Sequence, residues 1–407
     1  MKDAATFQCH GWKRFRIFIV SLIVAIGHGG TTAGDAVAAD DAKHQTIGST
    51  EVTAAIQAGI AYLKRVQNSD GSWSPAVGPA ITALSLAAML DAPGGDITDP
   101  SAQRALDYIL SHRRPDGGIH GGMLGNYNTA ICVSALSRLT EHVAAKKAVV
   151  DGRHYLIRIQ WDGQRDGAGV VVGPSHPFFG GSGYGRHGRP DLSNTQVMLQ
   201  ALHDSGLSPE DPAYQRALVF IARCQGSPSN DMFADAIASD GGFIYSTSTD
   251  KERIGRPQSM AGTTGKPGAD GSVSTLRTYG SMTYAGFKSL VYAGLARDDP
   301  RVVDALGWIR RHYTVMHNPG MPEDRRREGY FYYLVTTARA LHAWGEPEVA
   351  TPDGTRHDWS LDLAARIVEL QRPDGSWINT SSRWMETDPN LVTSFALTAL
   401  LVATSER

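Results

Sequence analysis

Three ionisable side chains occur on stretches of the sequence that otherwise carry almost no charge. Lys288 belongs to one such stretch, and Arg339 and His342 belong to the next. Burying groups of this kind is unfavourable unless they are paired or solvated. Two interpretations follow. Either the side chains reach the far end of their helices and are solvated there, or they form a cationic group in an interior space that binds a carboxylate or a phosphate.

Six hydroxyl-bearing side chains lie near the expected starts of the same stretches. They are Tyr279, Ser281, Thr283, Tyr330, Tyr332 and Tyr333. Tyrosines at helix starts commonly pack against neighbouring side chains. A group of tyrosine, arginine and histidine could instead abstract a proton next to a carboxylate. The candidate ligand-binding residues are therefore Thr283, Tyr284, Lys288, Tyr333, Arg339 and His342. The catalytic residues, if there are any, stay unassigned.

A sixfold internal repeat specifies the helices that must position these residues. The first helix of each repeat carries charge on one face, and five of the six have an aromatic–aliphatic step such as Tyr62-Leu63. The second helix carries a threonine followed by apolar residues four and seven positions later. The six threonines are Thr82, Thr129, Thr195, Thr283, Thr337 and Thr393. Second helices such as 391–402 hold no charged residue, so they must be buried on every side.

Amphipathic helices outside and apolar helices inside satisfy both patterns in a closed ring. The sequence therefore predicts an all-α fold, an (α/α)6 toroid of about twelve helices with negligible strand. Aspartate–proline pairs such as Asp99-Pro100 predict caps for the first helices. The links within pairs, including 161–190 and 226–276, are expected at one rim. There the half-charges of the inner-helix N-termini converge and favour an anion. Positions one, five and eight after each threonine are expected to face the interior.

Two links share a motif that resembles a known family. Gln67, Gly71 and Trp73 have the same spacing as Gln371, Gly375 and Trp377, and this spacing resembles the QW repeat of squalene cyclases. The mature chain as a whole resembles the squalene cyclase/protein prenyltransferase superfamily of α/α toroids. We interpret these six residues as structural, because glutamine can bond backbone groups, glycine permits a tight turn and tryptophan can cover the next helix.

The resemblance implies catalytic residues that this sequence does not have. Hopene-type cyclases protonate their substrate with a D-x-D-D motif, and no such string occurs here. The inner helices are expected to hold carboxylates only at their ends, Asp91 and Asp204, so no desolvated acid is predicted on the inner wall. Prenyltransferases bind zinc through an aspartate, a cysteine two residues later and a histidine. Cys132 and Cys224 each follow an alanine at that spacing, so neither a metal nor any other cofactor is predicted.

The function predicted from these observations is ligand binding at the barrel mouth by an exported relative of this superfamily. The ligand is expected to be apolar or anionic, either a small molecule or a glycan. The alternative is an enzyme of unfamiliar mechanism on this fold, either terpene/isoprenoid cyclase-like or acidic-polysaccharide lyase-like. The sequence leaves open whether the chain is an enzyme.

The N-terminal sequence predicts that the protein is exported. A basic stretch, an apolar run from Ile17 to Ile26 and the small residues 36–38 fit a signal peptide over residues 1–39. The run is shorter than a spanning helix needs, so we expect no stable membrane span after cleavage and an exported protein, periplasmic or extracellular. Residues 40–50 are expected to be disordered and 51–407 to form a single toroid domain. A net charge of -2 gives no reason to expect nucleic acid as a partner.

Overall fold

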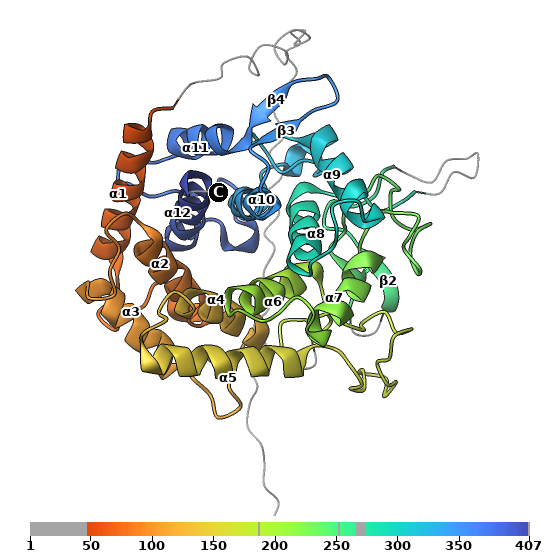
Figure 1. Cartoon of the computed structure of the whole chain (residues 1–407), viewed down its shortest axis with the longest axis horizontal. Helices are drawn as coiled ribbons and strands as arrows, with labels where there is room; N and C mark the ends of the chain where they lie inside the picture. The colour runs from red at the N-terminus through yellow and green to blue at the C-terminus, as the bar shows by residue number, and fades with distance from the viewer. Residues whose placement is uncertain (1–46, 186–187, 251–252, 266–273, 406–407) are drawn as a thin grey trace, which may run out of the picture. The chain divides into compact units, whose positions relative to one another are not determined.

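A computed structural model describes residues 47–185, 188–250, 253–265 and 274–405, all within one compact unit that begins at Gln45. The predicted signal peptide and residues 40–46 lie outside the described residues. The predicted disordered stretch is wrong at its end, because Ser49 and Thr50 belong to the first helix. In the described part of the chain, twelve α-helices form two concentric layers (Figure 1).

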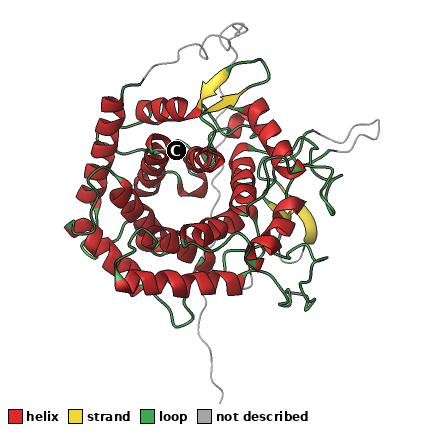
Figure 2. Ribbon diagram, viewed as in Figure 1, coloured by secondary structure: helices red, strands yellow, loops and turns green. Residues whose placement is uncertain are grey.

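The inner layer is a closed ring. It consists of α2 (Ala80–Asp91), α4 (Gly125–Leu136), α6 (Leu192–Asp204), α8 (Gly280–Tyr292), α10 (Tyr330–Trp344) and α12 (Pro389–Thr404). Each helix contacts the next, and α12 contacts α2. These helices carry the six repeat threonines, so the predicted toroid and its inner layer are confirmed (Figure 2).

The outer layer consists of α1 (Ser49–Val66), α3 (Pro100–Ser111), α5 (Val143–Ile159), α7 (Pro212–Arg223), α9 (Pro300–His312) and α11 (Trp359–Glu369). Asp99, Asp211 and Asp299 accept hydrogen bonds from backbone N–H groups of α3, α7 and α9, as their aspartate–proline pairs predicted. None of the described helices is both long enough and apolar enough to cross a membrane.

The other elements lie in the links. Three short 3-10 helices are η1 (Pro75–Val77), η2 (Glu323–Arg325) and η3 (Arg383–Met385). Strand β1 (Ser246–Ser248) pairs antiparallel with β2 (Ile254–Gln258), and β3 (Glu348–Ala350) pairs antiparallel with β4 (Arg356–Asp358). The sheets have two strands each and take no part in the ring.

A residue at one place in every repeat, glutamine in four of the six, joins each outer helix to the next one. Gln67 Nε2 donates to the carbonyl of Ser101 on α3 at 2.9 Å and to the carbonyl of Gly71 at 3.0 Å. Gln371 makes the same pair of bonds to Gly375 and to Ala55 on α1, which closes the ring between the last repeat and the first. In the other repeats the joining pairs are Gln160–Ala213, Gln225–Arg301, Arg113–Asp151 and Tyr313–Asp362.

The glycine and tryptophan of the motif also contact only protein. Gly375 has a φ of +87°, and a Cβ there would lie 2.4 Å from the carbonyl oxygen of Ala58 on α1. Trp73 and Trp377 are fully buried, and their indole N–H groups donate to the carbonyls of Leu63 and Ile367. The motif residues therefore stabilise the contacts between repeats.

The inner threonines hold the loop ends rather than lining the interior. Thr393 Oγ1 accepts the backbone N–H of Trp377 at 3.1 Å, and Thr82 Oγ1 accepts that of Trp73 at 3.0 Å. Thr283, a candidate ligand residue, likewise accepts the N–H of Phe243. Thr337 differs from the other five, because its buried hydroxyl accepts no backbone N–H group and lies instead beside the hydroxyl of Tyr333.

This difference gives the first prediction. Thr393→Val should lower the free energy of unfolding by about 1–3 kcal/mol, because it leaves a buried N–H group without an acceptor. Thr337→Val should lower stability less than Thr393→Val, since no buried backbone N–H group loses its acceptor. Urea denaturation of both variants measures the difference, and an equal loss in the two would contradict the role given to these hydroxyl groups.

Candidate functional site

The inner helices run parallel, so the interior of the ring has two distinct ends. Near the helix starts, Asn126 on α4 donates to Asn194 on α6. Just past the helix ends, Arg138 after α4 forms an ion pair with Asp91, the last residue of α2. Polar side chains therefore gather separately at the N-terminal end, which the loops cover, and at the C-terminal end.

Arg339 lines a small cavity inside the ring. The cavity, with a volume of about 20 Å³, is lined by residues of α2, α4, α6 and α10, together with Arg138: Ala83, Leu84, Ala87, Ile131, Ser134, Ala135, Arg138, Val197, Gln200 and Arg339. Leu84, Ile131, Val197 and Arg339 each lie two residues after the repeat threonine of their helix. The interior positions are thus mainly the second and fifth after each threonine, which corrects the expected set of one, five and eight.

The guanidinium of Arg339 differs from that of the other arginine in the cavity wall. Arg138 is held by two bonds of 2.6 Å to the Asp91 carboxylate and by a bond to the carbonyl of Ser134. Arg339 is half-buried and makes no hydrogen bond or ion pair to any described residue. Against the effect of burial, the hydrogen bond from His203 and then the charge of Arg339 lower the pKa of Asp204, but no short bond holds the guanidinium itself, which is the type of donor that suits a carboxylate or a phosphate.

Lys288 lies next to this cavity and is almost completely buried, with 1% of its surface exposed. Its Nζ donates to Gln200 Oε1 at 2.7 Å and lies 5.5 Å from the centre of the Tyr292 ring. Burial, and then the charge of Arg339, lower the pKa of the Lys288 amine well below its usual value. The fold therefore brings together two of the candidate ligand-binding residues, Lys288 and Arg339.

The other candidate residues do not line the cavity. Thr283 bonds the loop backbone, and the buried rings of Tyr284 and Tyr333 pack edge to face with centres 5.6 Å apart. Tyr333 donates its hydroxyl to the carbonyl of Thr314, in the link between α9 and η2. His342 Nδ1 lies 3.5 Å from Ser405 Oγ, beyond the end of α12.

The cations of the cavity region lie away from the mouth at which ligand binding was predicted. Lys288, Arg339 and Arg138 lie toward or beyond the C-terminal ends of their helices, not at the rim where the N-termini converge. The physical reason is that the negative half-charge of a helix C-terminus favours a cation. An anion held by these side chains would therefore bind deeper in the ring than the predicted mouth.

Two buried acids that the sequence analysis did not name lie beside the starts of inner helices, outside the helices themselves. Asp191, which caps α6, is fully buried, and burial raises its pKa to about 6. Glu386 is also fully buried and accepts the backbone N–H groups of Tyr332 and Phe331 at the start of α10. Burial raises the pKa of Glu386 to about 7. The sequence before α6 contains a cap signal at Asp191, but Glu386 is distant in sequence from the helix it caps.

A set of neutral polar groups accompanies these acids at the N-terminal end. The hydroxyls of Tyr184 and Tyr245 lie 3.4 Å apart, and Gln196 Nε2 donates to the hydroxyl of Tyr332 at 2.8 Å. The buried side-chain oxygens of Asn126 and Gln196 have no hydrogen-bond partner among the described residues. This end of the interior can therefore accept hydrogen bonds from a ligand.

The described residues contain no group of three or more His, Cys, Asp or Glu placed to hold a metal ion. Cys132 and Cys224 are buried free thiols, and burial raises the pKa of both. His176 Nε2 lies 3.1 Å from Asp166 Oδ2, and this buried pair is not part of the ring interior.

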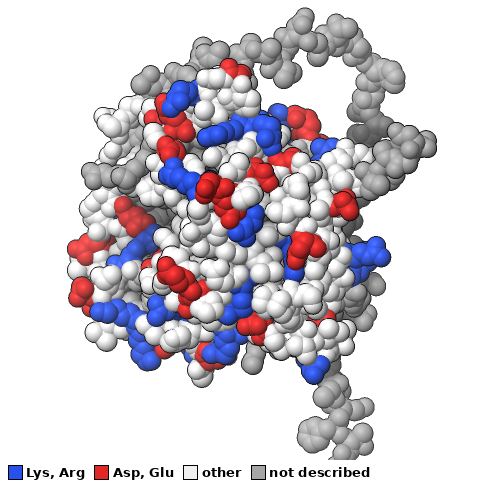
Figure 3. Space-filling view, turned by 45° about the vertical axis from the view of Figure 1, so that its right-hand side comes forward, with Lys and Arg blue, Asp and Glu red and all other residues white. Residues whose placement is uncertain are grey.

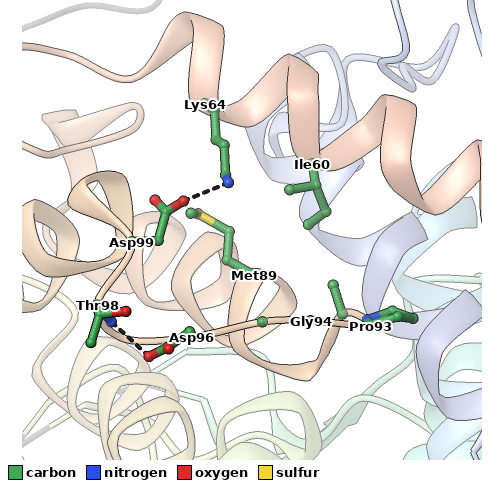
Figure 4. A pocket seen from close by; sticks show the side chains of 10 residues that line it. Ile60, Lys64, Met89, Pro93, Gly94, Asp96, Thr98 and Asp99 are labelled. Carbon is green, nitrogen blue, oxygen red and sulfur yellow. Dashed lines mark hydrogen bonds and ion pairs between the residues drawn. The ribbon is translucent and has the colours of Figure 1, made fainter.

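A larger cavity, of about 320 Å³, lies between the outer helix α1 and the link from α2 to α3 (Figure 4). Lys64 and Asp99 form an ion pair of 2.6 Å at its edge, and Ile60 and Met89 supply apolar surface. Lys64 and Asp99 are already paired with each other, and the third charged group, Asp96, accepts the backbone N–H of Thr98. The face shown in Figure 3 mixes lysine and arginine with aspartate and glutamate, so it offers no surface of a single charge.

Known proteins resemble this chain in sequence over part of its length and in fold over most of it. No protein-family model matches the chain. A probable squalene–hopene cyclase from Sinorhizobium fredii is 26% identical over 192 residues, which cover 46% of this chain and 23% of that protein. The chain therefore matches about a quarter of the length of this curated relative.

Solved structures share the arrangement of helices. An unsaturated glucuronyl hydrolase from Streptococcus agalactiae has a TM-score of 0.52 at 14% identity, covering 88% of this chain and 92% of that one. The type II terpene cyclase MstE from Scytonema has a TM-score of 0.48 at 14% identity, covering 86% and 98%. At such identities the likeness shows the α/α toroid fold alone. The curated match confirms the resemblance to squalene cyclases.

Proposed function

We propose that the chain binds, inside the ring, a ligand with an anionic group and an apolar part. The observation that carries the proposal is the guanidinium of Arg339, which faces an interior cavity without a partner among the described residues. The anionic group is a carboxylate or a phosphate, both of which match the planar donors of arginine. The aliphatic side chains around Arg339, such as Leu84, Ile131 and Val197, supply the apolar contacts.

The size of the cavity sets a condition on this proposal. A volume of about 20 Å³ holds roughly one water molecule. A larger ligand must displace side chains, and Arg339 is suited to move because no bond to a described residue holds it. The cavity is thus expected to widen as the ligand binds.

The experiment is a calorimetric titration with decanoate, decyl phosphate and the uncharged decanol. We expect both anions to bind more tightly than decanol. Arg339→Gln should weaken the anions roughly 10- to 100-fold and leave decanol unchanged, since a charge-assisted hydrogen bond contributes about 1.5–3 kcal/mol. Arg310→Gln removes an exposed arginine on the outer helix α9 and serves as the control. Equal affinity of Arg339→Gln and the parent chain for the anions would contradict the proposal.

A catalytic function is the second candidate, and the buried acid Asp191 favours it. With a pKa of about 6, this carboxyl group is partly protonated near neutral pH and can donate a proton. Polyprenyl and uronate compounds are the two substrate classes to test. Chemical conversion of either one, lost in Asp191→Asn while decanoate still binds, would establish this function. Binding without conversion would leave ligand binding as the function.

A further inference from the structure

The amine of Lys288 has few of the contacts that a buried ammonium ion needs. Its one hydrogen bond goes to Gln200 Oε1, at 2.7 Å. It forms no ion pair with a described carboxylate: the charge of Asp204 acts on it from a distance and partly opposes the effect of burial on its pKa, while the Asp204 carboxylate accepts from Gln200 Nε2 at 2.7 Å. A buried lysine with one neutral hydrogen-bond acceptor and no ion pair is shifted toward the uncharged state, although the ring of Tyr292 favours the cation.

The guanidinium of Arg339 also lowers the pKa of Lys288. Burial is the main influence that lowers the pKa of Lys288, and the charge of Arg339 adds to it. A lowered pKa increases the fraction of amine that keeps a free electron pair and can act as a nucleophile. Desolvation next to a second cation is one of the two arrangements by which proteins activate lysine for reaction with carbonyl compounds.

Gln200 connects this amine to the cavity. Its side chain lines the cavity beside Arg339, and its Oε1 atom holds the Lys288 amine. A ligand oxygen at the position of Gln200 Oε1 would therefore be next to both the amine and the interior space. Arg339 thus lines the cavity, and the Lys288 amine lies one side chain away from it, behind Gln200.

We propose that Lys288 forms a reversible imine with the carbonyl group of an oxo acid whose carboxylate is bound by Arg339. The proposal rests on the anion site of the proposed function and names the substrate class of that site. The electron pair of Nζ attacks the carbonyl carbon and forms a C–N bond, while the C=O π pair moves to oxygen. Both protons of the uncharged amine pass to this oxygen in turn, the nitrogen pair forms the C=N bond, and the C–O bond breaks as the oxygen leaves as water. No oxidant or reductant is needed.

The experiment traps the imine in the full-length protein. The protein is incubated with 2-oxooctanoate and cyanoborohydride, and the intact mass and the modified peptide are measured. We expect one reduced adduct per chain, on Lys288, at concentrations that leave the exposed Lys147 unmodified. 2-Octanone, which has no carboxylate, should give at least roughly tenfold less adduct, and so should Arg339→Gln.

Two variants separate reactivity from folding. Lys288→Met should give no adduct but still bind octanoate, because it keeps Arg339 and removes only the amine. Lys288→Arg keeps a cation without a nucleophilic amine and should also give no adduct. Circular dichroism checks that both variants fold, which is expected because loss of an unpaired buried amine removes a desolvation penalty.

The outcomes distinguish the two proposals. Adducts spread equally over Lys147 and Lys288, or an unchanged adduct in Lys288→Met, would overturn the imine. No adduct despite octanoate binding that depends on Arg339 would also overturn it and leave the proposed function intact. Failure of octanoate to bind would overturn the proposed function, and an adduct that does not depend on Arg339 would overturn the assignment of an oxo acid.

Discussion

Replacing Gly375 with alanine should lower the free energy of unfolding by at least about 3 kcal/mol. The left-handed conformation, with φ of +87°, alone costs about 1–2 kcal/mol for a residue with a Cβ. The new Cβ would also lie 2.4 Å from the backbone oxygen of Ala58, so α1 must move away from the link that follows α11. That movement also disturbs the bond from Gln371 to Ala55 that closes the ring.

Gly354→Ala is the matched control for this prediction. Gly354 has a φ of +89°, but a Cβ there would meet no atom within 4 Å. Gly354→Ala should lower the free energy of unfolding only by the cost of the left-handed conformation, about 1–2 kcal/mol. Urea denaturation measures both variants, and equal losses would show that the contact between the last and first repeats contributes nothing to stability.

Replacing Glu386 with glutamine should remove a large part of the dependence of stability on pH. Burial raises the pKa of Glu386 from 4.5 to about 7 in the folded chain. Between these values the folded state holds a proton that the unfolded state has released, so stability falls as pH rises from about 4.5 to about 7. The shift of about 2.5 units corresponds to about 3 kcal/mol over this window.

The measurement is urea denaturation at a series of pH values. Asp191, with its pKa raised to about 6, adds a fall of the same sign at lower pH, so the comparison is between the parent chain and Glu386→Gln. The variant should lose the fall between about pH 6 and 7, while Glu210→Gln, at an exposed glutamate, should keep it. A variant with the full pH dependence of the parent would show that Glu386 ionises in the folded protein as it does in the unfolded chain.

The ring could be predicted from the sequence because the same pattern of helices occurs six times along the chain. Six threonines in one register and alternating amphipathic and apolar helices specify the two layers without any knowledge of contacts. The bond from Gln371 to Ala55 joins residues more than three hundred positions apart, and only the closure of the ring makes it possible. The motif predicted the local turn, and the repeat predicted the partner helix.

The candidate site was predicted only in part, because side-chain direction depends on the rotation of each helix. One residue of register separates Tyr284, which packs against Tyr333, from the positions that line the cavity. A change of one residue turns a side chain by about 100° around a helix, and the apolar pattern of a fully buried helix does not specify that rotation. Lys288 and Arg339 could be named because charge on an uncharged helix is visible without the rotation.

The buried acids were missed for a different reason. Glu386 lies in a link with other polar residues, and its burial results from capping α10, a helix of the preceding repeat. No local pattern predicts a capping residue that lies after the helix it caps. Such acids are found only when the tertiary structure is known.

The most direct test of the anion site is a crystal structure of the protein with 10-bromodecanoate, measured at the bromine absorption edge. The account predicts one bromine position per chain inside the ring and the carboxylate within hydrogen-bond distance of the Arg339 guanidinium, with Leu84, Ile131 and Val197 around the alkyl chain. A carboxylate bound at the loop rim or on the outer surface, with Arg339 still unpartnered, would contradict it.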